Sequence, residues 1–328
     1  MSTFKAVRVT QGADKAVAAA LVDATIDELG AGEVVIAARF ASINYKDALA
    51  VTGRGRIMTR FPCIAGIDVA GVVESSTDAR FHVGDPVFVN GFGLGVSHDG
   101  GFSERVRVPA DWVIPVPQGM TLLDVGTMGV AGFTAALAIH LMELNGLAPG
   151  GGRVLVNGAT GGCGSIGIDM LARRGYEVVA LTGKAASRDY LLDLGAAEVL
   201  VRGEFEMGKK ALEKAQFAGA LDSIGGEQLS WLTRSMMENG VIGAFGNAGG
   251  ADLATSVFPF ILRGVRLIGV NSNAPMAVRQ QVWARVATDL RPRHLDRVGF
   301  PITLDQVIGH CSRSVEGQVQ GRAIVHYG

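Results

Sequence analysis

The chain has 328 residues, of which 48% are hydrophobic and 19% charged, and its 30 basic and 31 acidic residues leave a formal net charge of −1. This length suits about two domains and a substantial buried core. Because the charges balance and no block of like charges stands out, the sequence argues against binding to nucleic acid or to an anionic membrane surface.

The first third of the chain is rich in short strand-like patterns. Apolar and polar residues alternate over several stretches, and Gly, Pro and Asp separate them. These stretches are 4–9, 33–40, 69–74, 85–89 and 103–109. Several short strands at this spacing predict a compact β-barrel-like domain.

From about Leu122 the pattern changes to alternating helices and strands. The most apolar run, Met128–Met142, contains Thr134 and His140 and is too short to cross a bilayer, so it predicts a buried helix. The predicted helices are 130–144, 165–173, 187–194 and 229–237, and the predicted strand segments are 154–156, 178–181, 198–201, 218–226, 240–246 and 265–270. This order indicates a doubly wound parallel sheet.

A short tail follows, with a helix over 277–289 and strands over 302–304 and 321–326. It is too short for a third domain, so we expect it to complete the first. The predicted domains are therefore 1–122 with 293–328, and 123–292. The chain also begins with a strand-like pattern rather than a secretory signal, and we expect a cytoplasmic protein.

A glycine-rich turn separates two buried strands of the second domain. Arg153–Val156 leads into Asn157–Ser165, an apolar-periodic helix follows, and Glu177–Leu181 forms the next strand. Glycines at such a turn let backbone N–H groups approach a pyrophosphate at the positive end of the helix. The predicted pyrophosphate cradle is Thr160, Gly161, Gly162, Cys163, Gly164, Ser165 and Ile166.

The end of the second strand lacks the acidic residue that NAD-preferring sites usually place there. The sequence reads Thr182-Gly183-Lys184, with Ser187 close behind and Arg202 after the next strand. A carboxylate would repel a 2′-phosphate, whereas hydroxyl groups, Lys and Arg bind one. We therefore expect NADPH rather than NADH, with a plain surface charge as the alternative for Arg202.

The cysteines and histidines do not predict a metal site. Cys63, Cys163 and Cys311 are scattered, which is typical of a reducing compartment. Cys63 and Asp68 would supply two zinc ligands, but a third is hard to find, and the histidines do not cluster. We expect no bound metal.

Several motifs along the chain carry a family resemblance. They are Asn44–Leu49, Gly66–Gly71, Gly100–Glu104, Gly132–Ala136, Thr182–Lys184, Phe245–Gly250 and Phe258–Val265. Together they are similar to the acryloyl-CoA reductase group of the zinc-independent quinone-oxidoreductase branch, within the medium-chain dehydrogenase/reductase superfamily. Where zinc members carry Gly-His-Glu, this chain has Gly66-Ile67-Asp68. The resemblance implies a GroES-like β-barrel domain followed by a Rossmann domain.

The resemblance also implies a reaction, the NADPH-dependent reduction of acryloyl-CoA to propionyl-CoA. Hydride would reach the β-carbon, and the resulting enolate would take a proton at the α-carbon without help from a metal. Tyr45 is the expected donor near the nicotinamide, with Asn44 as an amide donor to the thioester oxygen. The alternatives are a packing or cofactor-contacting role for Tyr45 and a turn-forming role for Asn44.

Other residues receive roles by motif match or by pattern. By motif match, Asn247, Ile261 and Ser272 resemble positions that line the nicotinamide half of the cofactor. We expect Lys46 and Asp47 to form a solvated pair and Asp68 to make structural backbone hydrogen bonds. Arg54, Arg56 and Arg60 would bind coenzyme A phosphates or form a solvated basic loop.

Two other functions stay open from the sequence. One is a quinone or enone oxidoreductase on the same fold, and the other is a non-catalytic NADPH-binding protein. We also expect a homodimer, because the apolar strand 265–270 would lie at the edge of the nucleotide-binding sheet and needs a partner or cover.

Overall fold

The computed structural model describes residues 3–328 and divides the chain into two compact units. Unit 1 comprises Met1–Val130 and Leu295–Gly328, and unit 2 comprises Ala131–His294. The sequence predicted a boundary between residues 122 and 123, at the start of helix α2 (Leu122–Leu144). The division instead falls inside this helix, between Val130 and Ala131.

Unit 1 is built from two sheets and a few short helices. One sheet has three strands in the order β2-β1-β4, and the other has seven, in the order β15-β16-β3-β5-β6-β8 with β7 paired to β3. The strands are β1 (Phe4–Gln11), β2 (Val17–Ala24), β3 (Val34–Ser42), β4 (Cys63–Ile64), β5 (Asp68–Ser76), β6 (Pro86–Asn90), β7 (Arg105–Val108), β8 (Ile114–Pro115), β15 (Gly299–Ile302) and β16 (Arg322–His326). The strand-rich prediction is confirmed, but the pairing among residues 3–328 does not close into one barrel.

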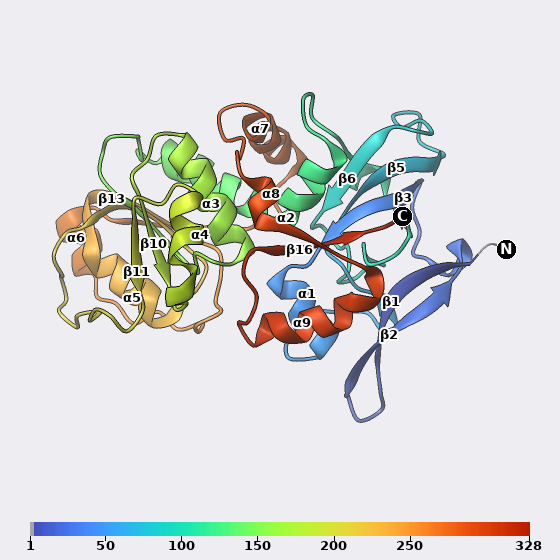
Figure 1. Cartoon of the computed structure of the whole chain (residues 1–328), viewed down its shortest axis with the longest axis horizontal. Helices are drawn as coiled ribbons and strands as arrows, with labels where there is room; N and C mark the ends of the chain where they lie inside the picture. The colour runs from blue at the N-terminus through green and yellow to red at the C-terminus, as the bar shows by residue number, and fades with distance from the viewer. Residues whose placement is uncertain (1–2) are drawn as a thin grey trace. The chain divides into compact units, whose positions relative to one another are not determined.

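The tail of the chain returns to this unit. Strand β16 pairs antiparallel with β3, and helix α9 (Val307–Val315) packs beside helix α1 (Tyr45–Thr52) (Figure 1). Helix α8 (Leu295–Val298) leads into β15. The last strand therefore reaches the residues at the end of β3, where α1 begins.

Unit 2 is a six-stranded parallel sheet in the order β11-β10-β9-β12-β13-β14. Its strands are β9 (Val154–Asn157), β10 (Val178–Thr182), β11 (Glu198–Val201), β12 (Phe217–Asp222), β13 (Met236–Ala244) and β14 (Arg266–Gly269). Its helices, besides α2, are α3 (Gly162–Arg173), α4 (Arg188–Asp193), α5 (Gly226–Ser235), α6 (Phe258–Arg263) and α7 (Met276–Val286). This arrangement confirms the predicted doubly wound sheet.

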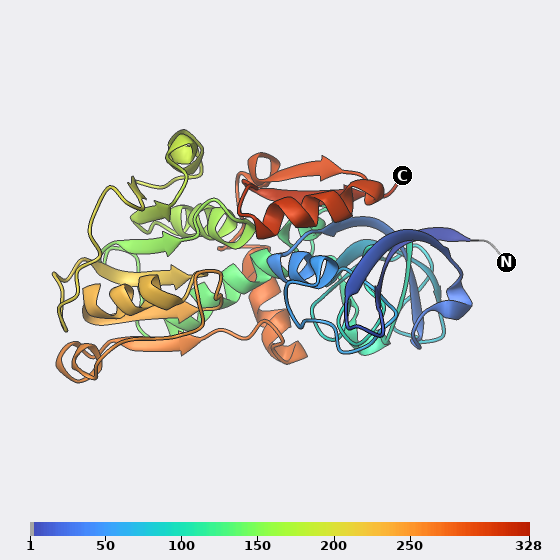
Figure 2. The same ribbon diagram turned by 90° about the horizontal axis from the view of Figure 1, so that it is seen from below.

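Helices cover both faces of the sheet in unit 2 (Figure 2). Leu155 and Ile242 pack with side chains of α5 on one face. On the other face of the sheet, Gly243 faces Met142 of α2. Gly167 of α3 approaches Leu221 on this second face too. Alternate residues of each strand therefore enter two different cores, which explains why these strands read as continuous apolar runs.

Helix α2 bends at Gly129, whose φ is +45°. An 18-residue window of α2 is apolar enough for a membrane span, but 83% of that window is buried inside the protein. Its first turns belong to unit 1, where Gly126 approaches Phe40, and the rest belongs to unit 2. The helix therefore contributes to two cores, and the sequence pattern alone does not reveal the bend.

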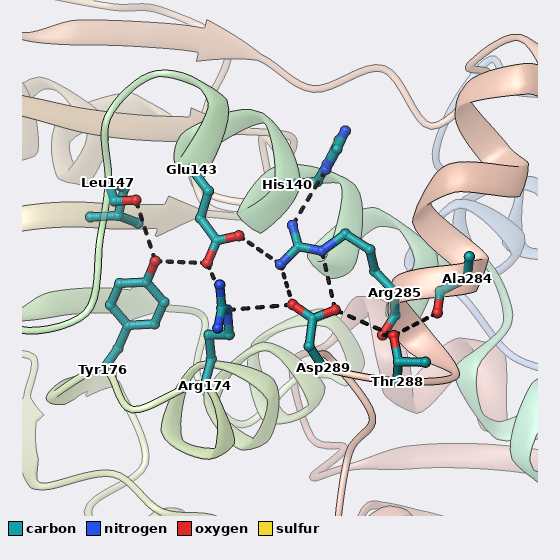
Figure 3. A network of polar contacts seen from close by, with 9 residues as sticks. All are labelled: His140, Glu143, Leu147, Arg174, Tyr176, Ala284, Arg285, Thr288 and Asp289. Atoms are coloured by element: carbon teal, nitrogen blue, oxygen red, sulfur yellow. Dashed lines mark hydrogen bonds and ion pairs between the residues drawn. The ribbon is translucent and has the colours of Figure 1, made fainter.

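A polar network joins three segments of unit 2 (Figure 3). Glu143 near the end of α2 forms an ion pair with Arg285 of α7 at 2.6 Å and accepts a hydrogen bond from Tyr176 at 2.9 Å. Arg174 lies 3.1 Å from the same carboxylate, and Arg285 also binds Asp289. Because Glu143 and Arg285 are largely buried, the network holds the ends of α2, α3 and α7 together away from the carboxyl ends of the strands.

Candidate functional site

Two glycines of the turn in unit 2, Gly158 and Gly164, have no room for a side chain. Gly158 adopts φ +56°, and a Cβ there would collide with Ser223. A Cβ on Gly164 would lie 2.5 Å from the Gly158 carbonyl oxygen and 2.8 Å from Ala159 Cα. Helix α3 starts directly after this turn and directs its first backbone N–H groups outward from its amino end. The turn therefore fits a pyrophosphate held by backbone groups.

The predicted cradle residues take two kinds of position. Thr160 and Gly161 lie in the turn, and Gly162, Cys163 and Gly164 form the first turn of α3. Ser165 and Ile166 are fully buried, so only their backbone lies near the cradle. The Ser165 hydroxyl donates to the Ala159 carbonyl at 3.1 Å and accepts from the Tyr190 hydroxyl at 2.9 Å.

A buried carboxylate lies at the base of this site. Asp222 ends β12 and accepts hydrogen bonds from the side-chain amide of Asn157 and from the Gly225 backbone N–H. Asn157, at the end of β9, accepts the Ser223 N–H at 2.8 Å. Burial raises the pKa of Asp222. These bonds join the ends of two neighbouring strands below the glycine turn.

Cationic side chains gather at the ends of the next two strands. Thr182 accepts the Lys184 N–H on its hydroxyl at 3.0 Å, and its carbonyl accepts the Arg202 N–H at 2.7 Å. A Cβ on Gly183 would lie 3.2 Å from an Arg202 guanidinium nitrogen, which places this side chain beside the turn. Within residues 3–328 no carboxylate forms an ion pair with Arg202, and burial lowers the pKa of Lys184. The structure thus brings Thr182, Lys184 and Arg202 together, while Ser187 next to them is buried.

The remaining predicted cofactor residues lie at both edges of the sheet. Asn247 follows β13 and Ser272 follows β14, both at the carboxyl edge that also carries the glycine turn. Ile261 lies on α6, which precedes β14 at the amino edge, and 68% of its surface is exposed. Within one chain, Ile261 is therefore not brought together with the other predicted cofactor residues.

Unit 1 contains a buried charged cluster where β3, β5 and β16 meet. Arg322 of β16 lies 3.1 Å from the Asp68 carboxylate, and their side chains are 2% and 3% exposed. Asp68 accepts hydrogen bonds from the Ser42 backbone at 2.8 Å and from the Val130 N–H at 3.1 Å. The expected structural backbone bonds of Asp68 are present. A Cβ on Gly129 would collide with this cluster, so the bend of α2 needs a glycine.

The same cluster fixes the start of helix α1. Asn44 and Asp47 form a reciprocal capping box, and Asp47 also accepts the Ile67 N–H at 2.9 Å. The Asn44 side chain donates to Asp47 and Asp68 at 2.9 Å each, and accepts from Arg322 at 2.9 Å. Its catalytic role stays a prediction, and these contacts favour a positioning role instead.

Tyr45 is the first residue of α1 and is 45% exposed. The neighbouring Asp47 is 1% exposed, so the expected solvated pair with Lys46 is wrong, because the cap draws this carboxylate inward. Burial, and next the negative charge of Asp68, raise the pKa of Asp47 to about 7. The Tyr45 ring is therefore accessible to solvent, while the capping box of Asn44 and Asp47 fixes the backbone of the helix turn that carries it.

Among the predicted coenzyme A arginines, two have other partners. Arg54 lies 3.7 Å from Glu316, and Arg60 lies 3.1 Å from the buried Asp99. Arg56 is exposed. The arginines do not gather into one cationic patch through any described contact.

The residues of unit 1 do not fit a zinc ion. Among residues 3–328, no group of three His, Cys, Asp or Glu side chains gathers as ligands. Cys63 and Asp68 have different neighbours. Cys63 lies beside Asp99, and burial and the charge of Asp99 raise the pKa of this thiol to about 12, whereas Asp68 pairs with Arg322. Where two carboxylates do meet, at Asp47 and Asp68, the guanidinium of Arg322 already provides the positive charge.

Comparisons with known families agree with this architecture. Residues 30–118 match the alcohol dehydrogenase GroES-like domain, and residues 162–288 match the family described as zinc-binding dehydrogenase. The fold and the nucleotide site thus define a two-domain dehydrogenase/reductase of the medium-chain superfamily.

Individual relatives narrow the assignment. YhfP of Bacillus subtilis, whose name assigns it provisionally to the quinone oxidoreductases, is 44% identical over 99% of both chains. Acrylyl-CoA reductase AcuI of Ruegeria pomeroyi is 41% identical over 94% of both chains. The chain therefore belongs to the family of AcuI and YhfP, an oxidoreductase family, which confirms the resemblance seen in the sequence.

Solved structures of this family carry nucleotides. The YhdH oxidoreductase of Salmonella enterica in complex with NADP is 40% identical, with a TM-score of 0.95 over 99% of this chain and 100% of that one. The structure of YhfP has NAD bound, with 42% identity and a TM-score of 0.96 over the whole of both chains.

Sequence reasoning missed three buried polar residues that shape these sites. Asp222 follows an apolar strand directly, which is a usable signal for a side chain at a carboxyl edge. Arg322 and Arg279 each interrupt an otherwise apolar pattern in a strand or helix, and both are fully or almost fully buried. A buried arginine is rare enough to indicate a specific partner, but the sequence does not say which.

The raised pKa of Asp47 makes the stability of unit 1 depend on pH. From pH about 4, near the ordinary pKa of 3.8, to about 7, the folded protein keeps a proton on Asp47 that the unfolded chain releases. The contribution of Asp47 to the free energy of unfolding therefore falls as pH rises through this window. Asp47→Asn cannot ionise, so the difference in unfolding free energy should shift in favour of the variant between pH 4.5 and 7.5.

Urea unfolding of both proteins across this range measures the difference. Asp27→Asn is the control, because it makes the same chemical change at an exposed carboxylate. A pH-independent difference for Asp47→Asn would contradict the account.

Proposed function

We propose that the protein reduces the C=C bond of a short 2-enoyl-CoA thioester with NADPH, acryloyl-CoA being the substrate and propionyl-CoA the product. The observation that carries the proposal is the glycine turn of unit 2 with the cations Lys184 and Arg202 at the ends of the next two strands. The family relative AcuI, named an acrylyl-CoA reductase, supports the choice of substrate. A conjugated thioester is electrophilic at its β-carbon and needs no Lewis acid to accept hydride.

The residues of unit 2 fit NADPH. The glycine turn would hold the pyrophosphate, since added Cβ atoms would fill that space. Lys184 and Arg202 would hold the 2′-phosphate, which favours NADPH over NADH although the relative YhfP was crystallised with NAD. When bound, NADPH supplies the hydride that the β-carbon accepts.

The residues of unit 1 would stabilise the charge that then develops. The electron pair of the C=C bond moves onto the thioester oxygen, and the α-carbon takes a proton, so the product is a saturated thioester. Tyr45 is the proposed hydrogen-bond donor, and its hydroxyl donates or relays the proton from water. Asn44, Asp68 and Arg322 hold the first turn of α1, and with it Tyr45, in place.

A steady-state series tests this proposal. NADPH oxidation is followed with acryloyl-CoA, with the acryloyl thioester of N-acetylcysteamine, with a simple quinone and with an enone. We expect acryloyl-CoA to give the highest kcat/KM, and the truncated thioester to lose at least about 10-fold, because remote binding energy is used at the reacting centre. Quinone turnover with no reaction of the thioester would favour the second candidate, a quinone reductase, which the name of YhfP supports. Binding of NADPH without turnover of any acceptor would indicate a non-catalytic binding protein.

The cofactor assignment has its own test at Arg202. Arg202→Ala should raise KM for NADPH by roughly 10- to 100-fold, because charge-assisted hydrogen bonds to the 2′-phosphate contribute about 1.5–3 kcal/mol. The KM for NADH should not change. Arg188→Ala is the matched control, because Arg188 donates to the Val199 carbonyl and pairs with Glu204. An equal loss for both cofactors in Arg202→Ala would contradict the assignment.

We also infer that the protein is a cytoplasmic homodimer. Strand β14 is at the end of the sheet order in unit 2, so one row of its backbone groups lacks a neighbouring strand among residues 3–328. The adjoining helix α6 exposes Ile261 and Leu262, at 68% and 61%. An isologous contact between two copies would cover both. Sedimentation equilibrium at micromolar concentration should give twice the mass of the chain, and a monomer would overturn the inference.

A further inference from the structure

The fourth residue of helix α7 is a fully buried arginine. Arg279 lies in the first turns of α7 and is 0% exposed. Its guanidinium lies 5.0 Å from the centre of the Phe133 ring, which stacks on Trp283 at 6.2 Å. The cation therefore lies over an aromatic ring of α2, and both residues belong to unit 2.

This placement is unfavourable for the helix itself. A positive charge near the amino end opposes the helix dipole, and burial removes the guanidinium from water. Burial lowers the pKa of Arg279 to about 10. A residue that breaks local rules in this way is expected where its contacts serve a function or a demanding turn.

The contacts of Arg279 hold the segment between β14 and α7. Its Nε donates to the Ala274 carbonyl at 2.9 Å, and its Nη2 donates to the Ser272 carbonyl at 2.8 Å. At the other end of this segment, the Val270 N–H donates to the Ala244 carbonyl at the end of β13. The loop 271–275 is thereby fixed at both ends on the carboxyl edge of the sheet.

That edge is the one that carries the proposed cofactor site. Parallel sheets of this kind bind nucleotides at the carboxyl ends of their strands. The loop 271–275 follows β14, which two strands, β12 and β13, separate from β9 and its glycine turn, and it lies next to the loop that carries Asn247. A displacement of about 1 Å at such a position is enough to lower the rate of hydride transfer by roughly 100-fold.

We propose that Arg279 is a positioning residue for the nicotinamide end of the cofactor, acting through the loop that carries Ser272. The inference rests on the proposed function in one respect, which is that this loop faces the nicotinamide. The Nε and Nη2 of one planar guanidinium donate to two carbonyls at once, and lysine lacks this fork of donors, so lysine cannot replace arginine here. The adenosine end, at Lys184 and Arg202, lies at β10 and β11 and makes no described contact with Arg279.

The experiment uses the full chain with Arg279→Lys and Arg279→Gln. Arg263 supplies the matched control, since its guanidinium also donates to backbone carbonyls, those of Arg234, Met236 and Glu213. It does so on α6 at the amino edge of the same sheet. Arg263→Lys and Arg263→Gln therefore report the cost of losing such contacts away from the cofactor.

Two readouts need no acyl-CoA turnover. The first is the change in nicotinamide fluorescence when NADPH binds, and the second is the affinity for 2′,5′-ADP, which contains only the adenosine end. We expect Arg279→Lys to lose at least half of the fluorescence change while its affinity for 2′,5′-ADP stays within about 2-fold. With any acceptor that the wild type turns over, kcat should fall by roughly 10-fold or more. The Arg263 variants should keep both signals at a comparable loss of melting temperature.

Each other outcome counts against the inference. A full fluorescence change in Arg279→Lys and Arg279→Gln would overturn it, and so would equal effects of the Arg263 and Arg279 variants. Parallel loss of NADPH and 2′,5′-ADP binding would show a general role in folding instead. If Arg279→Gln does not fold, Arg279→Lys decides. Because both binding readouts are made without substrate, a wrong choice of substrate leaves this test intact.

Discussion

The buried ion pair between Arg322 and Asp68 is the interaction on which unit 1 depends most. It joins the last strand of the chain to the end of β3 and the start of β5, and the same carboxylate holds the backbone where α2 bends. Removing one partner of a buried pair leaves an uncompensated charge and typically costs about 3–5 kcal/mol. The return of the chain after unit 2 is thus required by a single buried charge, and not only by apolar packing.

That ion pair also links structure to the proposed chemistry. Asn44 connects it to the capping box of α1, so the helix that carries Tyr45 starts at a fixed point. Zinc-dependent members of the superfamily use a metal to organise and polarise this kind of site. Here a guanidinium contributes the positive charge, and its Nη2 donates to Asp68, Ser42 and Asn44, while its buried Nε has no hydrogen-bond partner among the described residues. The cluster can therefore position a donor, while polarisation of the substrate must come from hydrogen bonds.

Unit 2 depends on a different constraint, the absence of side chains at the carboxyl edge of its sheet. Gly158, Gly164 and Gly246 each lie where a Cβ would meet backbone or side-chain atoms too closely. The charged groups then stand around this open backbone surface, with Arg202 beside Gly183 at one end and Arg279 below Ser272 at the other. In the proposed site, the close backbone approach at these glycines would set where the cofactor lies, and the two arginines would act on its opposite ends.

The sequence predicted the periodic parts of the molecule well and the special positions poorly. The glycine turn between β9 and α3, the parallel sheet and the edge position of β14 follow from strand and helix periods. The helix α1 was missed because it is short and starts in a motif that resembles a loop. Asp47 was misplaced for a related reason, since a capping box turns a charged side chain inward and leaves no periodic signal.

Long-range partners were equally out of reach of the sequence. Arg322 meets Asp68 across 254 positions, and nothing near either residue indicates the other. Ile261 was assigned by motif alone, and because α6, which carries it, lies at the amino edge of the sheet, its role toward the cofactor stays a prediction.

The fate of the transferred atoms tests the central claim most directly. The protein is supplied with acryloyl-CoA and with NADPH carrying deuterium at C4 of the nicotinamide, once with each stereoisomer, and the product is analysed by NMR. For one stereoisomer of the cofactor, the account predicts propionyl-CoA with one cofactor-derived deuterium on the β-carbon. When the reaction is run in D2O with unlabelled NADPH, it predicts one solvent-derived deuterium on the α-carbon. Cofactor deuterium at the α-carbon, or oxidation of NADPH without any saturated thioester, would contradict it.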